Sequence, residues 1–210
     1  MRAYTVCVNY ADELSLSLPR ARWLFNHFTV ITTPTDFDTL RLATQYECET
    51  YVTECFYEDG GPFRKYRAIE QAIERWKREG WIALLDADVL LPAVIPGWDA
   101  IEPGNLYGMP RRMCADLRVP HESRWDKFPL SINSTREIPG YFQLFHASDA
   151  HLPDPPWFED VPDCGAADSY FCRNWPKPQQ VRFDCECLHV GPNRTHWQGR
   201  KKRTPAAENA

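Results

Sequence analysis

Two aspartates, Asp86 and Asp88, follow directly after an apolar run at residues 81–85. Two carboxylates this close repel each other unless a cation or a hydrogen-bond donor neutralises them. Carboxylate oxygens suit Mg²⁺ and Mn²⁺, and Mg²⁺ is often held by one or two carboxylates together with substrate phosphates. The pair is therefore a candidate divalent-metal centre. A solvated acidic turn after a core strand is the simpler interpretation of so short a motif.

Basic and imidazole side chains elsewhere in the chain are candidates to complete such a site. Arg64 and Lys65 begin a helical pattern, and the first turn of a helix favours bound anions such as phosphates. His189 ends a strand-like run, where a metal ion or a local hydrogen bond would satisfy its ring. Arg194 and Trp197 follow it and are candidates to close over a bound anion. For the cationic residues the alternative is a solvated charged surface.

The elements that must position these residues alternate along the first ninety residues. Four runs rich in apolar and β-branched residues predict strands, at 4–9, 28–32, 49–53 and 81–85. Three stretches with helical spacing lie between them, at 12–27, 36–45 and 63–79. We expect Pro19 to break the first helix, Asp36 to cap the second and Gly80 to end the third.

This order predicts an α/β fold with a mixed, mostly parallel central sheet and helices on both faces. Ligands bind such sheets at the carboxyl ends of the strands, where Asn9, Tyr10, Asp86 and Asp88 lie. The second half of the chain reads as long loops rich in proline. Within it, short strands are expected at 106–109, 141–146 and 181–189, and one helix at 166–175.

Length and composition predict one domain rather than two. The chain has 210 residues, of which 43% are hydrophobic, and we expect a single catalytic domain over 1–200. We divide this domain into the halves 1–92 and 93–200 and expect a disordered polar tail at 201–210. A net charge of -5 gives no overall basic field for nucleic acid.

Eight cysteines raise the question of disulfides or zinc. The N-terminus has no secretory pattern and no segment is long enough to span a membrane, so we expect a cytoplasmic protein, in the host-cell cytosol if a virus encodes it. Free thiols follow from that compartment. The closest pair, Cys185 and Cys187, lacks the spacing of a structural zinc site.

Four segments resemble the GT-A glycosyltransferases, the Rossmann-like class of nucleotide-diphospho-sugar transferases. The first strand ends in Asn9-Tyr10, and Phe63-Arg64-Lys65 precedes the long helix. Leu85-Asp86-Ala87-Asp88 resembles the family's Asp-x-Asp strand end, and Leu188-His189-Val190-Gly191 resembles its late His-x-Gly signature. The resemblance covers residues 4–92 and then shorter islands at 140–146, 164–175 and 187–200. It implies that 1–92 is the nucleotide-sugar-binding half of the domain and 93–200 the acceptor-binding half.

The resemblance implies a metal centre. Asp88 and His189 would bind Mn²⁺ or Mg²⁺, which grips the diphosphate of a nucleoside-diphosphate sugar. Asp86 would bind either the metal or the ribose or sugar of the donor.

The resemblance also implies a donor-binding set, made of Asn9, Tyr10, Asp36, Arg64, Lys65, Asp86, Arg194 and Trp197. In it, Asn9, Tyr10 and Asp36 correspond to the region that holds the base and ribose, with Tyr10 suited to stacking on the base. A plain helix cap is an equal alternative for Asp36.

Asp168 is the candidate catalytic residue. Residues 164–171 resemble the acceptor-side helix of inverting members, in which an aspartate deprotonates the acceptor hydroxyl. Ala167 stands here in place of the usual preceding glutamate. In a retaining enzyme, which the His-x-Gly ending favours, Asp168 would only orient the acceptor, and a helix cap is the simplest role. Residues 140–143 are expected to line the sugar and acceptor cleft.

Together these features predict a metal-dependent glycosyltransferase that moves a sugar from a UDP- or GDP-type donor to a hydroxyl acceptor. The acceptor classes are a glycan, a protein or a hydroxymethylated DNA base, for which the basic clusters 111–112 and 200–203 are candidate contacts. One alternative is a nucleotidyltransferase, which needs a glycine-rich loop that residues 9–12 do not offer. The other is a non-catalytic module that binds nucleotide sugars.

Overall fold

The structure is a computed structural model, and it describes residues 1–60, 63–117, 121–131, 138–158 and 164–191. Strands and helices alternate in the first half of the chain, as β1 (Arg2–Val6), α1 (Ala11–Ala21), β2 (His27–Thr32), α2 (Phe37–Gln45), β3 (Glu49–Val52), α3 (Lys65–Arg75) and β4 (Trp81–Asp86). The second half consists mainly of short strands, with β5 (Val89–Leu90), β6 (Leu106–Gly108), β7 (Arg111–Cys114), β8 (Phe142–His146), α4 (Cys164–Cys172), β9 (Gln180–Arg182) and β10 (Cys187–Val190).

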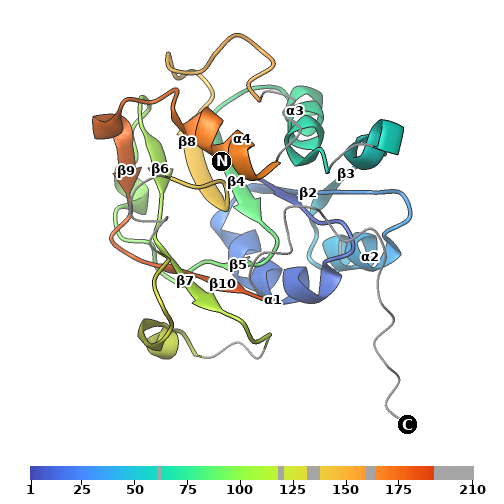
Figure 1. The fold of residues 1–210 in the computed structure, drawn as a ribbon, viewed down its shortest axis with the longest axis horizontal. Helices are drawn as coiled ribbons and strands as arrows, with labels where there is room; N and C mark the ends of the chain where they lie inside the picture. Colours follow the sequence, from blue (N-terminus) through green and yellow to red (C-terminus); the bar gives the residue numbers. More distant parts are fainter. Residues whose placement is uncertain (61–62, 118–120, 132–137, 159–163, 192–210) are drawn as a thin grey trace.

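In the described part of the chain, these strands form two sheets (Figure 1). The large one has seven strands in the order β3-β2-β1-β4-β8-β6-β9. Its first four strands are parallel, and β8 runs antiparallel to β4 and β6. The small sheet has the order β5-β10-β7, with β10 antiparallel to β5 and parallel to β7. The predicted α/β class with a mixed, mostly parallel sheet is confirmed.

The alternating side chains of β4 divide the core into two layers. Ala83 and Leu85 pack in one cluster with α1 and α2, whereas Ile82 and Leu84 pack in another with α3 and α4. Figure 1 shows the two pairs of helices on opposite sides of the large sheet. Because the side-chain period of a strand is two residues, a polar residue at the end of β4 must face one layer or the other.

The first strand and the first helix end earlier than predicted, since β1 ends at Val6 rather than at residue 9 and the helical residues end at Leu24 rather than at residue 27. Pro19 lies inside α1 rather than breaking it, and a 3₁₀ turn, Arg22–Leu24, extends the helix. Proline removes one backbone hydrogen bond, and at this place only two further residues of the helix follow. The expected cap of α2 is confirmed, because the Asp36 side chain accepts a hydrogen bond from the amide of Thr39.

Two further predictions of element boundaries were wrong. The helix predicted at 63–79 ends at Arg75, and Lys77 takes a left-handed φ of 69° before Gly80 is reached. The single strand predicted at 181–189 is two strands, since β9 joins the large sheet and β10 the small one. Alternation continues through both strands, so the sequence pattern carries no sign of the change of sheet.

Two expectations from the sequence concern the state of the thiols and the presence of a membrane-spanning helix. The seven cysteines whose side chains are described are free, and five of them are buried: Cys7, Cys55, Cys114, Cys172 and Cys187. Across the described residues, no helix has the length and apolar character needed to cross a bilayer. The polar tail at 201–210 lies outside the described residues.

Asp36 connects β1, β2 and α2. Its carboxylate is 4% exposed and accepts hydrogen bonds from the amide of Asn9 at 2.6 Å and from the hydroxyl of Thr32 at 3.2 Å. It also accepts from both the amide and the hydroxyl of Thr39, at 3.2 and 2.7 Å. Asn9 has a left-handed φ of 63°, a conformation that asparagine tolerates better than most residues. One carboxylate thus fixes the turn after the first strand.

We expect Asp36→Ala to lower the free energy of unfolding by about 2–4 kcal/mol, because a helix cap is lost and buried donors lose their acceptor. Urea denaturation measures the change. The matched control is Asp38→Ala, in the first turn of the same helix, whose carboxylate is partly exposed and paired with Arg41. Its effect should stay within about 1 kcal/mol, and equal losses in both variants would contradict the structural role of Asp36.

Candidate active site

Asp86 lies on the α3 side of the large sheet. It follows Ile82 and Leu84 at two-residue spacing and therefore shares their face. Lys65, the first residue of α3, forms an ion pair with its carboxylate. The amide of Asp86 donates to the carbonyl of Tyr141 at 3.0 Å, which fixes the end of β4 against the start of β8.

Asp88 lies beyond the turn after β4 and contacts a different part of the chain. Because β5 pairs antiparallel with β10, Val89 lies opposite His189. The Asp88 Oδ2 and His189 Nε2 atoms are 3.2 Å apart, and the two residues are only 5% and 6% exposed. The two residues predicted as direct metal ligands are therefore brought together across a hundred residues of sequence.

Two hydrogen bonds hold the turn that carries Asp88. The hydroxyl of Ser17, in α1, donates to the carbonyl of Ala87 at 2.6 Å, and the amide of Val190 donates to the carbonyl of Asp88 at 2.9 Å. Sequence reasoning missed Ser17, which is 2% exposed. A buried polar residue on the apolar face of the first helix was the available signal.

The pKa of His189 reflects two opposed influences. Burial disfavours the imidazolium and alone would lower the pKa, but the charge of Asp88 and its hydrogen bond favour the imidazolium more strongly. The pKa is therefore raised. Asp88 is the main partner that determines the protonation of this ring.

Asp168 lies in α4, opposite the turn before β8. Its carboxylate accepts hydrogen bonds from the amides of Gly140 and Ser169, both at 2.7 Å. Burial raises the pKa of this carboxyl, and these two amides and the charge of Lys65 only partly offset the effect. Lys65 thus acts electrostatically on Asp168 as well as on Asp86, so three of the predicted residues belong to one local site.

Gly140 allows this close approach. A Cβ at this position would lie 2.5 Å from the Cβ of Asp168 and would collide with the hydroxyl of Tyr66. The next residues do not line an open cleft as predicted, because Phe142 and Gln143 are fully buried. The side-chain amide of Gln143 instead donates to the carbonyl of Ile138 at 3.0 Å. The turn before β8 therefore serves packing as much as binding.

A cleft of about 330 Å³ lies at the carboxyl end of β1, between the first turns of α1 and α2. Asn9 and Asp36 line it, as predicted for a nucleoside site, together with Ala11, Asp12, Thr35, Phe37 and Asp38. Tyr10 is only 8% exposed and packs in the core, which does not fit the expected stacking on a base. Phe37 is 73% exposed and is an aromatic side chain that sequence reasoning missed.

The remaining predicted donor-binding residues have different outcomes. Arg64 is the N-cap residue of α3, and its Nη1 atom lies 3.7 Å from Oε2 of Glu58. Its guanidinium therefore faces an acidic side chain at the start of the helix. Arg194 and Trp197 lie outside the described residues, as does the basic cluster 200–203.

The basic pair at 111–112 is not in a loop, as the sequence suggested, but in β7. Arg112 binds Glu186 through two nitrogens, one of them at 2.9 Å, and donates to the carbonyls of Asp126 and Phe128. Such a clamped guanidinium is a structural element rather than an open contact for DNA. The prediction that this pair lies in a loop was wrong.

The Asp88–His189 pair suits a divalent ion only together with ligands from outside the protein. Within the described ranges, no group of three or more His, Cys, Asp or Glu side chains is arranged to hold a metal ion alone. Two donors bound to one ion at right angles, each at about 2.1 Å, lie about 3 Å apart. The 3.2 Å between Asp88 Oδ2 and His189 Nε2 matches this spacing. One carboxylate and one imidazole therefore suit Mn²⁺ or Mg²⁺ if substrate oxygens complete the coordination.

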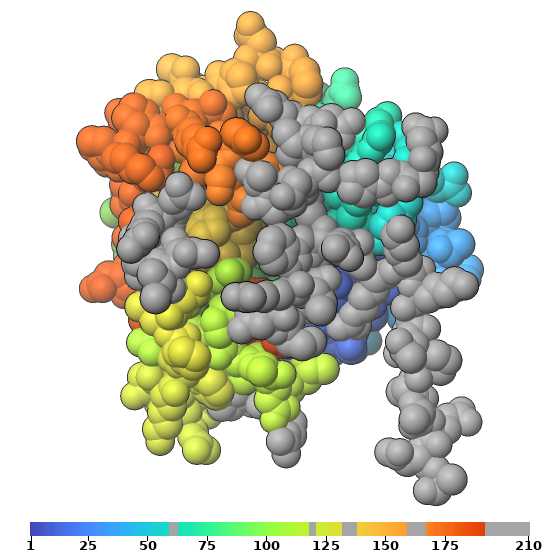
Figure 2. All heavy atoms as spheres, viewed as in Figure 1, coloured from blue at the N-terminus to red at the C-terminus, as the bar shows by residue number. Residues whose placement is uncertain are grey.

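In Figure 2, α4 lies at the upper left, α3 at the upper right, and the segment after β7 at the lower left of the same face. The division of the domain into 1–92 and 93–200 stays a prediction.

No protein-family model matches the sequence, and a search of curated proteins found no match. Several solved structures have a similar fold. A mycobacterial protein matches over 93% of this chain and 68% of its own, with 12% identity and a TM-score of 0.51.

Two transferases match over shorter stretches. The galactosyltransferase LgtC, solved with donor and acceptor sugar analogues, covers 70% of this chain with 17% identity and a TM-score of 0.44. Glucosyl-3-phosphoglycerate synthase from Mycobacterium tuberculosis, solved with Mn²⁺, UDP and phosphoglyceric acid, covers 53% with 14% identity and a TM-score of 0.37. The chain spans only 58% and 43% of the lengths of these two proteins.

At these identities the likeness concerns the fold alone. That fold is an α/β domain with a mixed, mostly parallel sheet and helices on both faces, the fold class that the sequence predicted.

Because the pKa of Asp168 is raised, the free energy of unfolding should depend on pH. The native carboxyl holds its proton to higher pH than the unfolded one, whose pKa is about 3.9. The native state thus binds more protons, so its stability falls as pH rises through this window. We expect the free energy of unfolding of the wild type to fall relative to that of Asp168→Asn from about pH 4 upward and then level off. Urea denaturation at a series of pH values measures this difference, and a flat or rising difference would contradict the effect.

Proposed function

We propose that this chain is a metal-dependent glycosyltransferase that moves a sugar from a UDP- or GDP-type nucleotide sugar to a hydroxyl acceptor. The observation that carries the proposal is the Asp88–His189 pair beside the Lys65–Asp86 pair at the carboxyl end of β4. The chain adds β2 and β3 on one side of β1 and then β4 on its other side. Ligands of open α/β sheets bind at such a switch point, which here lies between β1 and β4.

Asp88 and His189 would hold Mn²⁺ or Mg²⁺ in this proposal. The bound ion supplies positive charge that offsets the charge developing on the nucleoside diphosphate as the sugar leaves. Two protein ligands leave coordination positions for diphosphate oxygens, which is how Mg²⁺ is commonly bound in nucleotide enzymes. Asp86, on the α3 side of the sheet, would bind either the metal or the ribose or sugar of the donor.

The chain's own residues then position the donor. Lys65 and Asp86 present an ammonium and a carboxylate side by side, a combination that binds sugar hydroxyls and phosphate oxygens. The nucleoside occupies the cleft of about 330 Å³ lined by Asn9 and Asp36, where exposed Phe37 offers an aromatic face. In this arrangement the carboxylate of Asp36 fixes the backbone of Asn9 rather than binding the ribose. Arg194 and Trp197 remain proposed contacts to the diphosphate.

Asp168 is the proposed general base for an inverting transfer. Burial makes its carboxylate a stronger base than an exposed one, and the amides of Gly140 and Ser169 fix its orientation. Its oxygen would accept the proton of the acceptor hydroxyl while that hydroxyl attacks the sugar. In a retaining transfer the same carboxylate would orient the acceptor.

The acceptor class stays open among a glycan, a protein and a hydroxymethylated DNA base. The engagement of Arg112 with Glu186 weakens the DNA alternative. A nucleotidyltransferase is disfavoured because the turn after β1 is built from Asn9 and Tyr10, without the glycines that cradle a triphosphate. A non-catalytic module would bind the nucleotide without turning it over.

We expect the wild type to bind UDP or GDP more tightly in the presence of Mn²⁺ than without it. Asp88→Ala should weaken the Mn²⁺-dependent affinity by at least about tenfold, since one charged ligand is lost. Isothermal titration calorimetry with UDP, GDP and Mn²⁺ measures both effects. Asp99→Ala, at an exposed aspartate outside the site, is the control. Absence of nucleoside diphosphate binding to the wild type would overturn the proposed function.

We expect Asp168→Asn to slow hydrolysis of the sugar nucleotide, with water as acceptor, by at least about a hundredfold, because the proton acceptor is removed. Its affinity for UDP or GDP should match that of the wild type, since donor binding does not use this carboxylate. A screen of sugar nucleotides, followed by NMR of the released anomer, measures turnover and separates inversion from retention. Full turnover by Asp168→Asn would remove Asp168 as the base. Ser169→Ala is the control for a substitution in α4, because it keeps the backbone amide that binds Asp168, and it should turn over as the wild type does.

A further inference from the structure

Arg111 lies on the same face of the small sheet as His189. In the parallel pairing of β7 with β10, Arg111 is opposite Cys187 and Met113 is opposite His189. Because successive side chains alternate between faces, Arg111, Cys187 and His189 share one face. Arg112 points to the other face, where Glu186 and the carbonyls of Asp126 and Phe128 hold it. Two adjacent arginines therefore have different surroundings.

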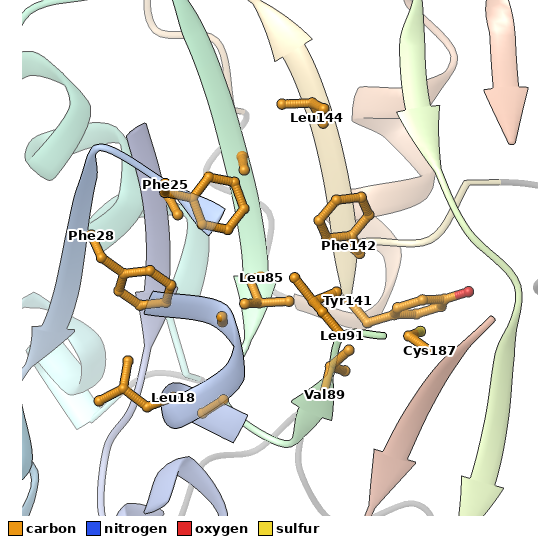
Figure 3. Packing of buried hydrophobic residues seen from close by; sticks show 14 of the residues in the cluster. Leu18, Phe25, Phe28, Leu85, Val89, Leu91, Tyr141, Phe142, Leu144 and Cys187 are labelled. Carbon is orange, nitrogen blue, oxygen red and sulfur yellow. The ribbon is translucent and has the colours of Figure 1, made fainter. Parts of the chain in front are cut away.

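An aromatic ring supports the guanidinium of Arg111. Its Cζ lies 4.5 Å from the ring centroid of Tyr141, which is a cation–π contact. The ring itself is fixed, because it is 2% exposed and its hydroxyl donates to the carbonyl of Met109 at 2.5 Å. Figure 3 shows Tyr141 beside Cys187, where the large and small sheets meet. This contact restricts the arginine side chain before any ligand binds.

The same tyrosine connects Arg111 with the proposed metal site. The carbonyl of Tyr141 accepts the hydrogen bond from the amide of Asp86. Arg111 also shares a face of the small sheet with His189, on the neighbouring strand. Arg111 is thus a cation beside the strand that carries His189, and Tyr141 connects it to the end of β4.

We propose that Arg111 binds the diphosphate of the nucleotide substrate, a role that rests on the proposed function. A guanidinium presents two parallel N–H donors that match two phosphate oxygens, and its planar face stacks on an aromatic ring at the same time. Lys65 and Arg111 then supply positive charge from two different elements, α3 and β7. The diphosphate, rather than the base or sugar, is the part of the substrate with the charge to match.

The test compares Arg111→Gln with wild type in Mn²⁺, using UDP, GDP and the matching free nucleosides as probes. We expect the variant to bind the nucleoside diphosphate at least about tenfold more weakly, and the nucleoside unchanged. Arg173→Gln is the matched control, because Arg173 is also stacked on a tyrosine, at 5.2 Å, but is exposed in the turn that follows α4. It should bind both probes as the wild type does.

The outcomes separate the two proposals. If the wild type binds a nucleoside diphosphate and Arg111→Gln binds it equally well, the role of Arg111 is wrong and the proposed function stands. If the wild type binds neither UDP nor GDP, the proposed function itself fails. Thermal unfolding checks that each variant is folded. Where Arg111→Gln is unfolded, Arg111→Lys decides, because it keeps the charge without the paired donors: a severalfold loss supports the role, and unchanged affinity overturns it.

Discussion

The short pairing of β5 with β10 is the contact on which the candidate site depends. It involves only two pairs of residues, yet it brings His189 to the carboxylate of Asp88. The chain can reach this arrangement because β4 ends in a tight turn whose carbonyls are held by Ser17 and Val190. Without that pairing, Asp88 would lie on an acidic turn with only Asp86 nearby, and two adjacent carboxylates alone bind a divalent ion weakly. The small sheet is therefore the part of the fold that assembles the site.

The change of direction after β4 also gives the two aspartates different partners. Asp86 keeps the alternation of the strand and faces α3, where Lys65 neutralises it. Asp88 lies past the turn and faces β10. One motif thus serves both layers of the molecule, with a lysine-balanced carboxylate on one side and a histidine-paired carboxylate on the other. This division is the reason why we propose Asp88, rather than Asp86, as the direct metal ligand.

A second theme is that buried polar residues hold the site from behind. Asp36 fixes the turn after β1 through four hydrogen bonds, and Gly140 donates to Asp168 across a space that admits no Cβ. Buried groups of this kind are costly unless they are satisfied. Their hydrogen bonds keep Asn9 and Asp168 in place before any ligand arrives, which lowers the entropic cost of binding. Arg111, stacked on the fixed ring of Tyr141, follows the same rule.

Much of the fold followed from the sequence by itself. The four parallel strands, the capping of α2 by Asp36 and the position of Asp86 and Asp88 at a strand end are set by local patterns of apolar residues and caps, which act over a few neighbouring positions. Other features were decided only by tertiary structure. The split of residues 180–190 between two sheets, the burial of Tyr10, the exposure of Phe37 and the opposite orientations of Arg111 and Arg112 all depend on which strand lies alongside. Strand pairing between distant segments leaves no periodic trace in the sequence, because alternation looks the same in every sheet.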